Sequence, residues 1–310
     1  MAVSNEAAMN LIDVHKTFRT DDECVEHLAK LRWPDGVRCV TCGTDKVRQY
    51  ASPTEKQPNR KIYQCQEPNC QQQFTATSGT IFHDTHLPLT KWFLALSIVV
   101  DAKKGISAKQ LQRHLSVGYK TAWYLAHRIR QAMEETDRPL LSGTVEIDEM
   151  YIGGRQRGHK GKRANKDVVV GMRQRGGPLR LVTTEDAKAE TLYNVIAEPV
   201  AKDVDTIMTD ENTAYNFKLT KYYRAKHRRI KHKRHVYVRG DVHTNTVENA
   251  FSLFKRAVIG TYHQLSIKHL QRYLNEFEYR FNRRENPNRF EETLARMAKG
   301  KPMPFEKLTA

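Results

Sequence analysis

Residues 144–152 read TVEIDEMYI, and the interpretation of the second half of the chain starts from this stretch. Apolar residues alternate with acidic ones, and a period of two is typical of a β-strand. Val145 and Ile147 are therefore expected on one face of the strand. Glu146 and Asp148 are expected on the other face. Aspartate is disfavoured inside strands, so a carboxylate at Asp148 is a candidate for chemistry rather than for folding.

The residues that follow predict a small mixed sheet covered by helices. The expected elements are strands at 144–152, 168–172 and 179–184, a helix at 187–198, a strand at 205–209, and helices at 246–258 and 267–284. Glycine-containing breaks separate the first three strands, which favours an antiparallel meander. Three strands, a helix, a strand and a helix, in this order, are typical of a ribonuclease-H-like α/β domain.

Two more acidic residues stand near the ends of predicted elements. Asp210 follows the apolar run 207–209, and a turn or helix cap is the ordinary role of an aspartate there. Glu248 lies in the first turn of the helix that begins near Asn245, at the margin of a core-facing stripe. Asn245 as N-cap with Glu248 three residues later is close to a capping box, so a structural role for Glu248 stays open. The stripe consists of Val247, Phe251, Phe254 and Val258.

Asp148, Asp210 and Glu248 together would form a site for hard divalent cations. They are 62 and 38 residues apart, so only the fold can bring them together. Carboxylate oxygens select Mg²⁺ or Mn²⁺. Two such ions clamp the attacking and leaving oxygens of an in-line displacement at phosphorus. This set of residues predicts phosphoryl transfer that needs no serine or cysteine nucleophile.

Four of the five cysteines form two close pairs, Cys39-x2-Cys42 and Cys65-x4-Cys70. The surrounding segment is poor in aliphatic residues and cannot build a core of its own. Two turns that each supply two thiolates can complete a tetrahedron around zinc, although the second spacing is wider than the usual x2. We expect one structural Zn²⁺, with four ordinary cysteines as the alternative. The close pairs argue against a disulfide framework and favour a reducing compartment.

Residues 107–130 predict two helices separated by a short break at Ser116-Val117-Gly118, an arrangement that resembles a helix-turn-helix. The second helix would present Lys120, Thr121 and Arg128 to DNA. Ordinary packing of two helices is the alternative.

The chain is strongly basic, which favours a polyanionic partner. Its 310 residues include 52 Lys and Arg against 35 Asp and Glu, a formal net charge of +17. Two acid-free runs, 155–166 with six Lys and Arg and 216–240 with ten, are interpreted as phosphate-binding tracks on DNA. Solvated charge is the alternative. The expected DNA contacts in and beyond these runs are Lys160, Lys162, Arg163, Arg228, Arg229, Lys231, Lys255 and Arg256.

Hydrophobic segments give no sign of a membrane partner. No apolar run reaches the ~20 residues that a membrane-spanning helix needs. The N-terminal residues lack the basic and then apolar pattern of a secretory signal. A cytoplasmic protein is therefore expected.

These motifs together resemble the DDE-type insertion-sequence transposases with an N-terminal zinc ribbon, the ISXO-like group. The resemblance covers residues 31–286 and rests on LRWPDGVRCVTCG, FTATSGTIFHDTHLPLTKWF, EIDEMYIGG, TDENTAY and HTNTVENAFSLFKRAVIGTYHQLSIKHLQRYLNEFEYRFNRR. It implies that Asp148, Asp210 and Glu248 are the catalytic metal ligands and that Lys255 matches the basic residue that follows them. Some members of the group carry Asn in place of the acid, so Asn245 and Asn249 are minor alternatives to Glu248 for this role.

The resemblance implies a multidomain α/β protein. Its expected parts are a helical lead-in at 1–38, a zinc ribbon at 39–87, a helix-turn-helix segment at 88–140, a ribonuclease-H-like (DDE) catalytic domain at 141–286 and a C-terminal tail at 287–310. The implied activity is binding of the element's terminal inverted repeats, cleavage at its ends and transfer of the 3′-hydroxyl strand to target DNA. The implied setting is a dimer or larger homo-oligomer on DNA, in the bacterial cytoplasm or nucleoid. A zinc-ribbon regulator that no longer cuts (a domesticated transposase) and a hydrolytic nuclease of the same fold are the alternatives.

Overall fold

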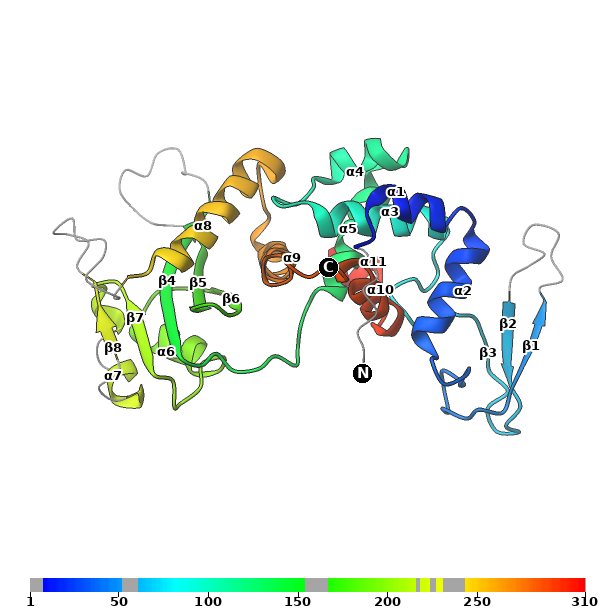
Figure 1. The fold of residues 1–310 in the computed structure, drawn as a ribbon, viewed down its shortest axis with the longest axis horizontal. Helices are drawn as coiled ribbons and strands as arrows, with labels where there is room; N and C mark the ends of the chain where they lie inside the picture. The colour runs from blue at the N-terminus through cyan, green and yellow to red at the C-terminus, as the bar shows by residue number, and fades with distance from the viewer. Residues whose placement is uncertain are drawn as a thin grey trace. The chain divides into compact units, whose positions relative to one another are not determined.

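The computed structural model describes residues 8–51, 61–153, 167–215, 218–223, 227–230 and 243–309. The chain divides into two compact units (Figure 1). Unit 1 consists of Met1–Ala102, Ile106–Met133 and Glu285–Ala310. Unit 2 consists of Lys103–Gly105 and Glu134–Arg284.

Unit 1 is mainly helical and includes one small sheet. Its helices are α1 (Leu11–Thr17), α2 (Asp21–Arg32), α3 (Leu89–Asp101), α4 (Ala108–Leu115), α5 (Tyr119–Ala132), α10 (Arg289–Lys299) and α11 (Phe305–Thr309). Helix α2 begins after Thr20, which forms a capping box with Glu23: each side chain accepts a hydrogen bond from the other residue's backbone N–H. Cys24 and Leu28 are the buried residues of α2.

The last segment of the chain differs from the tail expected at 287–310. Phe290, Leu294 and Met297 recur at helical spacing in α10 and are buried among the helices of unit 1. The ring of Phe290 lies 6.2 Å from that of Phe93 in α3. The apolar stripe of α10 therefore makes this segment part of the core of unit 1.

The small sheet of unit 1 contains three antiparallel strands in the order β1-β2-β3: Val47–Ala51, Lys61–Cys65 and Gln73–Phe74. Its core is short of aliphatic residues, as the composition predicts. Tyr63 and Phe74 stack with ring centroids 5.6 Å apart, and Trp33 packs edge-on against both. Cys39 and Cys65 belong to the same cluster, so the cysteines lie at the centre of this sheet's packing.

Unit 2 is built on a five-stranded sheet in the order β6-β5-β4-β7-β8. The strands are β4 (Thr144–Ile152), β5 (Asp167–Gln174), β6 (Leu179–Thr184), β7 (Thr206–Thr209) and β8 (His227–Arg229). The helices are α6 (Ala189–Ala197), α7 (Lys218–Tyr223), α8 (Asn245–Ala257) and α9 (Leu270–Asn282), with shorter helical turns η1 (Thr213–Tyr215), η3 (Val258–Tyr262) and η4 (Ile267–His269). Strands β4, β5 and β6 form the predicted antiparallel meander, and β7 and β8 continue the sheet in parallel. Strand β8 lies inside the basic run 216–240 and was not predicted.

Separate cores cover the two faces of this sheet. Val145 and Ile147 of β4 pack with α6, whose buried residues include Leu192 and Ile196. Met150 of β4 packs on the opposite face with α8 and α9. The alternation predicted for β4 is therefore confirmed, and α8 and α9 lie on the face that carries the even-numbered residues (Figure 1).

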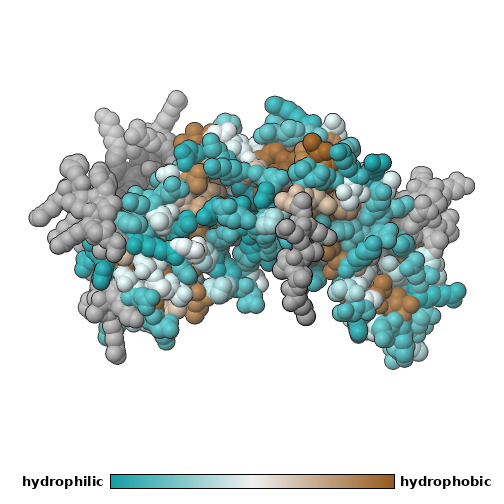
Figure 2. Space-filling model, viewed as in Figure 1, coloured by the Kyte–Doolittle hydropathy of each residue, from teal (hydrophilic) through white to brown (hydrophobic). Residues whose placement is uncertain are grey.

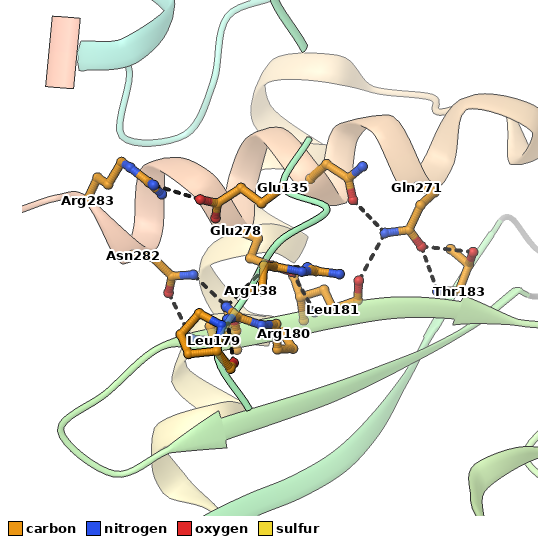
Figure 3. Close-up of polar contacts among 12 residues, drawn as sticks. Glu135, Arg138, Leu179, Arg180, Leu181, Thr183, Gln271, Glu278, Asn282 and Arg283 are labelled. Carbon is orange, nitrogen blue, oxygen red and sulfur yellow. Dashed lines mark hydrogen bonds and ion pairs between the residues drawn. The ribbon is translucent and has the colours of Figure 1, made fainter. Parts of the chain in front are cut away.

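Side chains of α9 cover the outer edge of β6 (Figure 3). Gln271, Glu278 and Asn282, spaced by seven and four residues, accept hydrogen bonds from the backbone N–H groups of Thr183, Leu181 and Leu179 at 2.8–2.9 Å. The amide groups of Gln271 and Asn282 also donate to the carbonyls of Leu181 and Leu179, each at 3.0 Å. An uncovered edge strand is a template for pairing with another chain, and α9 satisfies this one with side chains instead.

Candidate metal and nucleic-acid sites

Asp148 and Asp210 lie at the same end of two neighbouring parallel strands. Glu146 of β4 stands beside Met208 of β7 in the register, so Asp148 and Asp210 both follow this pair by two residues. Helix α8, which carries Glu248, packs on the same face of β4 and β5 through its apolar stripe. The fold therefore brings together the three carboxylates that the sequence separates.

The acidic groups around Asp148 act on one another electrostatically. Burial, together with the negative charges of Glu149, Asp210 and Glu248, raises the pKa of Asp148 from 3.8 to about 8. A carboxyl in this position favours its neutral form unless a positive charge is added. Because the donors are hard oxygens with an excess of negative charge, the group fits a divalent cation such as Mg²⁺ or Mn²⁺. Among the described residues, these carboxylates interact electrostatically, but their oxygen atoms are not grouped as closely as the sulfur atoms of the four cysteines.

Glu248 is held by a side chain rather than by the helix backbone. Helix α8 begins at Asn245 with Thr244 as its N-cap. Asn245 is therefore the first residue of the helix and not its N-cap, and the capping box considered for Asn245 and Glu248 is wrong. The Thr244 hydroxyl donates to Glu248 Oε1 at 2.6 Å and makes no cap hydrogen bond to the backbone. The carboxylate of Glu248 is thus oriented at the start of α8. Asn245 and Asn249 are both exposed.

Glu149 is a residue of this region that the sequence did not single out. Its carboxylate accepts hydrogen bonds from Asn212 Nδ2 at 2.6 Å and from the hydroxyl of buried Tyr215. Asp210 Oδ1 in turn accepts from the backbone N–H of Asn212 at 2.9 Å. Asn212 therefore links the β4 carboxylate to Asp210. The run TDENTAY was recognised as a family motif, but nothing in its local pattern identifies Glu149 as its partner.

The four paired cysteines form a second site, in unit 1. Their Sγ atoms all lie within 4.8 Å of one another, with Cys39 3.7 Å from Cys70 and Cys42 3.5 Å from Cys65. These distances are those of free thiols around a common centre, because a disulfide needs about 2.05 Å. The group fits a structural zinc ion, and Gly43 has the positive φ of 76° that the first turn requires.

Comparison with known proteins identifies the family of the chain. A model of the ISXO2-like transposase domain matches residues 140–282, and a model of a transposase zinc-ribbon domain matches residues 19–73. The chain is 30% identical over 286 residues to an uncharacterized protein in transposable element ISH50 of Halobacterium salinarum. That alignment covers 86% of this chain and 92% of the relative. This protein belongs to the ISXO2-like transposase family.

One solved structure is also similar to the transposase chain. It is the crystal structure of a pre-cleavage Mos1 transpososome, with a TM-score of 0.26 and 13% identity over 67% of this chain and 79% of that one.

The predicted recognition helix of the transposase is α5, and its two ends differ. Helices α4 and α5 are separated by the break predicted at Ser116–Gly118, where Ser116 is left-handed with a φ of 49°. Lys120 and Thr121 are exposed in the first turn of α5. Lys120 Nζ lies 4.4 Å from the ring centre of Phe305 in α11.

Arg128 does not fit its predicted role in DNA binding. Its side chain is only 5% exposed, and its guanidinium donates to the carbonyls of Ile81 and of His83, the latter at 2.7 Å. It also stacks 4.9 Å from the ring centre of Trp92. The second half of α5 is buried on several sides, so Arg128 serves the core of unit 1 and not a phosphate.

The remaining predicted DNA contacts are partly described. Arg228 and Arg229 are exposed on β8, and Lys255 and Arg256 are exposed in the last turn of α8. Lys160, Lys162, Arg163 and Lys231 lie outside the described residues. The face of the transposase in Figure 2 is mostly hydrophilic, with apolar residues in small separate groups. None of the described helices is long and apolar enough to cross a membrane.

Proposed function

We propose that this transposase binds the terminal inverted repeats of its element, cleaves at the ends and joins the free 3′-hydroxyl to target DNA by two-metal phosphoryl transfer. The observation that carries the proposal is the group of carboxylates around Asp148, whose pKa is raised to about 8 by burial and by neighbouring acids. Clustered negative charge of this kind is costly to a fold, and strongly perturbed pKa values cluster at functional sites.

Asp148, Asp210 and Glu248 are the residues that would hold the two Mg²⁺ or Mn²⁺ ions. When bound, such ions stabilise the charge that develops on the attacking and leaving oxygens of a phosphodiester. The chain's own part is to fix the carboxylates: Thr244 orients Glu248, and the N–H of Asn212 orients Asp210. Glu149 anchors Asn212 and so keeps the loop after β7 in place. This assignment places the chemistry in a ribonuclease-H-like domain of residues 141–286.

Sequence-independent contacts with DNA are assigned to the exposed cations of unit 2. Arg228, Arg229, Lys255 and Arg256 are exposed, and the chain as a whole carries a formal net charge of +17. Contacts with phosphates release counterions, so affinity for DNA should fall steeply as salt rises. Recognition of the terminal repeats is assigned to the zinc ribbon at 39–87, with Cys39, Cys42, Cys65 and Cys70 as zinc ligands, and to the helix pair α4–α5 through Lys120 and Thr121. The protein would act in the cytoplasm as a dimer or larger oligomer, since two element ends must be held together.

The test is strand transfer in vitro with labelled element ends, target DNA and Mg²⁺. The parent should produce joined products. Asp148→Asn and Asp210→Asn should each lower the rate by at least about 100-fold while affinity for end DNA stays within a few-fold, and Glu248→Gln should behave likewise. Asp203→Asn, an exposed aspartate of the same unit, is the matched control and should leave the rate unchanged. Cleavage without joining would identify a hydrolytic nuclease, and end binding without cleavage would identify a regulator; either result would refute transposition.

A further inference from the structure

Glu146 is a buried carboxylate that lies beside the acidic site but is not one of its predicted metal ligands. It is 0% exposed and stands on β4 two residues before Asp148, on the same face of the strand. Charged residues are almost never buried this completely unless they are paired and hydrogen-bonded. The partners of Glu146 therefore indicate what it does.

One oxygen of Glu146 binds the start of α8. Oε2 accepts hydrogen bonds from the backbone N–H groups of Thr246 at 2.8 Å and Val247 at 3.3 Å, and from the Thr246 hydroxyl at 2.8 Å. The first N–H groups of a helix have no partner within the helix and carry partial positive charge. Glu146 therefore caps α8 from a neighbouring strand.

The other oxygen of Glu146 is held by an arginine. Arg175 Nε donates to Oε1 at 2.7 Å, and His243 Nδ1 lies 3.2 Å from the same oxygen. Arg175 also donates to the carbonyl of His243 at 3.2 Å, so it fixes the residues that lead into α8. The carboxylate is thus anchored at both oxygens and cannot shift without breaking several bonds.

This external cap explains the unusual behaviour of Thr244. A threonine at the N-cap ordinarily uses its hydroxyl to satisfy the backbone of its own helix. Here Glu146 satisfies that backbone, and the Thr244 hydroxyl instead donates to Glu248 at 2.6 Å. The cap from β4 leaves Thr244 available to orient a predicted metal ligand.

A second feature brings α8 close to the sheet at the same place. Gly171 of β5 stands opposite Asp148 in the register. A Cβ at Gly171 would lie 2.5 Å from the ring of Phe251 and 2.9 Å from Val247 Cγ2. Only glycine allows α8 to approach β4 and β5 this closely. Glu146 fixes the start of the helix, and Gly171 fixes its height above the sheet.

We propose that Glu146 is a positioning residue for the carboxylate site: it holds the start of α8 on β4 so that Glu248 faces Asp148 and Asp210. The proposal rests on the proposed function, because it concerns the metal site assigned there. Removing a group that orients metal ligands typically weakens metal affinity by about 10-fold to 100-fold. Glu146→Gln should therefore weaken binding of Mn²⁺ by that factor.

Glu278→Gln is a matched control. Glu278 is also buried, also pairs with arginines and also bridges a helix to a strand of this sheet, through the N–H of Leu181. It lies on α9 at the far edge strand, away from β4 and β7 in the strand order. Both variants should lose stability, but only Glu146→Gln should change the carboxylate site.

The experiment has two measurements on the full-length, zinc-loaded parent and both variants. Hydrogen exchange without added metal reports the cap directly: exchange in the first turn of α8 should accelerate roughly tenfold in Glu146→Gln and stay at the parent rate in Glu278→Gln. Binding of Mn²⁺ alone, followed by electron paramagnetic resonance, should weaken only in Glu146→Gln. If Glu146→Gln does not fold, Thr246→Val removes one donor to the carboxylate and should shift both measurements a few-fold in the same direction.

Three results would refute parts of the proposal. Unchanged exchange in Glu146→Gln would refute the cap. Faster exchange with unchanged Mn²⁺ affinity, or an equal loss of affinity in both variants, would refute the positioning role and leave Glu146 as a purely structural residue. A parent protein that binds no Mn²⁺ would instead refute the proposed function and the positioning role with it, and this failure is recognised before any variant is made.

Discussion

Asp148→Asn is expected to stabilise the metal-free protein and to remove the stabilisation that Mg²⁺ gives the parent. Burial and the charges of Glu149, Asp210 and Glu248 raise the pKa of Asp148 from 3.8 to about 8. Between these values the folded chain holds a proton that the unfolded chain has released. The stability of the metal-free parent therefore falls as pH rises through this window, and asparagine, which cannot ionise, escapes this loss.

The size of the effect follows from the shift in pKa. One pKa unit corresponds to about 1.4 kcal/mol, and pH 7 lies about three units above the ordinary value of 3.8. The free energy of unfolding should therefore be about 4 kcal/mol higher for Asp148→Asn at pH 7, and nearly equal to that of the parent at pH 4. For a unit of this size the difference at pH 7 raises the unfolding temperature by roughly 10 °C.

Thermal unfolding followed by circular dichroism, in EDTA and in Mg²⁺ across pH 4 to 8, measures both effects. In EDTA the advantage of Asp148→Asn should grow with pH, and Mg²⁺ should stabilise the parent but not the variant. Asp203→Asn makes the same chemical change at an exposed position and should follow the parent. A variant that is less stable than the parent at pH 7 without metal would show that the carboxyl is not under electrostatic strain.

Three further predictions concern the zinc site, the seat of α8 and the edge of the sheet. Chelation of zinc should unfold the small sheet of unit 1 and expose its four thiols to alkylation. Cys24 should react slowest, because burial raises its pKa to about 12. The masses of the alkylated adducts measure the order of labelling, and rapid labelling of Cys24 beside the other four would contradict the prediction. Gly171→Ala should lower the free energy of unfolding, measured in urea, by about 1–3 kcal/mol, because the added methyl group overpacks against Phe251. Gly260→Ala adds the same group where no other atom lies nearby and should cause no such loss. Equal losses in the two variants would rule out close packing as the cause. Asn282→Ala should cost about 1–3 kcal/mol and promote association through the exposed edge of β6, as measured by denaturation and light scattering. Asn194→Ala, at an exposed position on α6, should stay monodisperse, and a stable, monodisperse Asn282→Ala would refute the edge-cover role.

Patterns that depend only on near neighbours in the sequence were sufficient for much of the fold. The alternation of 144–152 predicted both faces of β4, and its glycine-bounded successors predicted the meander. The spacing of the cysteines predicted the group that the structure assembles. The stripe of α8 was also predicted, because a period of 3.6 residues is a local property.

Local patterns failed where a side chain's partner comes from elsewhere in the chain. Arg128 looks like a phosphate contact in sequence, and only packing against Trp92 and the carbonyls near it makes it a core residue. The segment after residue 287 looks like a tail until its apolar stripe is buried in unit 1. A strand as short as β8, which consists of His and Arg, contains too few residues for an alternating pattern to be detected.

The sequence by itself determined the chemistry that is possible here: which carboxylates and thiols exist, which strands and helices carry them, and which family they belong to. Tertiary structure alone decided how those groups are placed. Asp148 acquires its raised pKa from burial and from the charges of Glu149, Asp210 and Glu248. Glu248 acquires its position from Thr244 and from Glu146 on another strand. The physical reason is that burial and electrostatic interaction depend on distance in space, which residues 62 and 38 positions apart in the chain do not reveal.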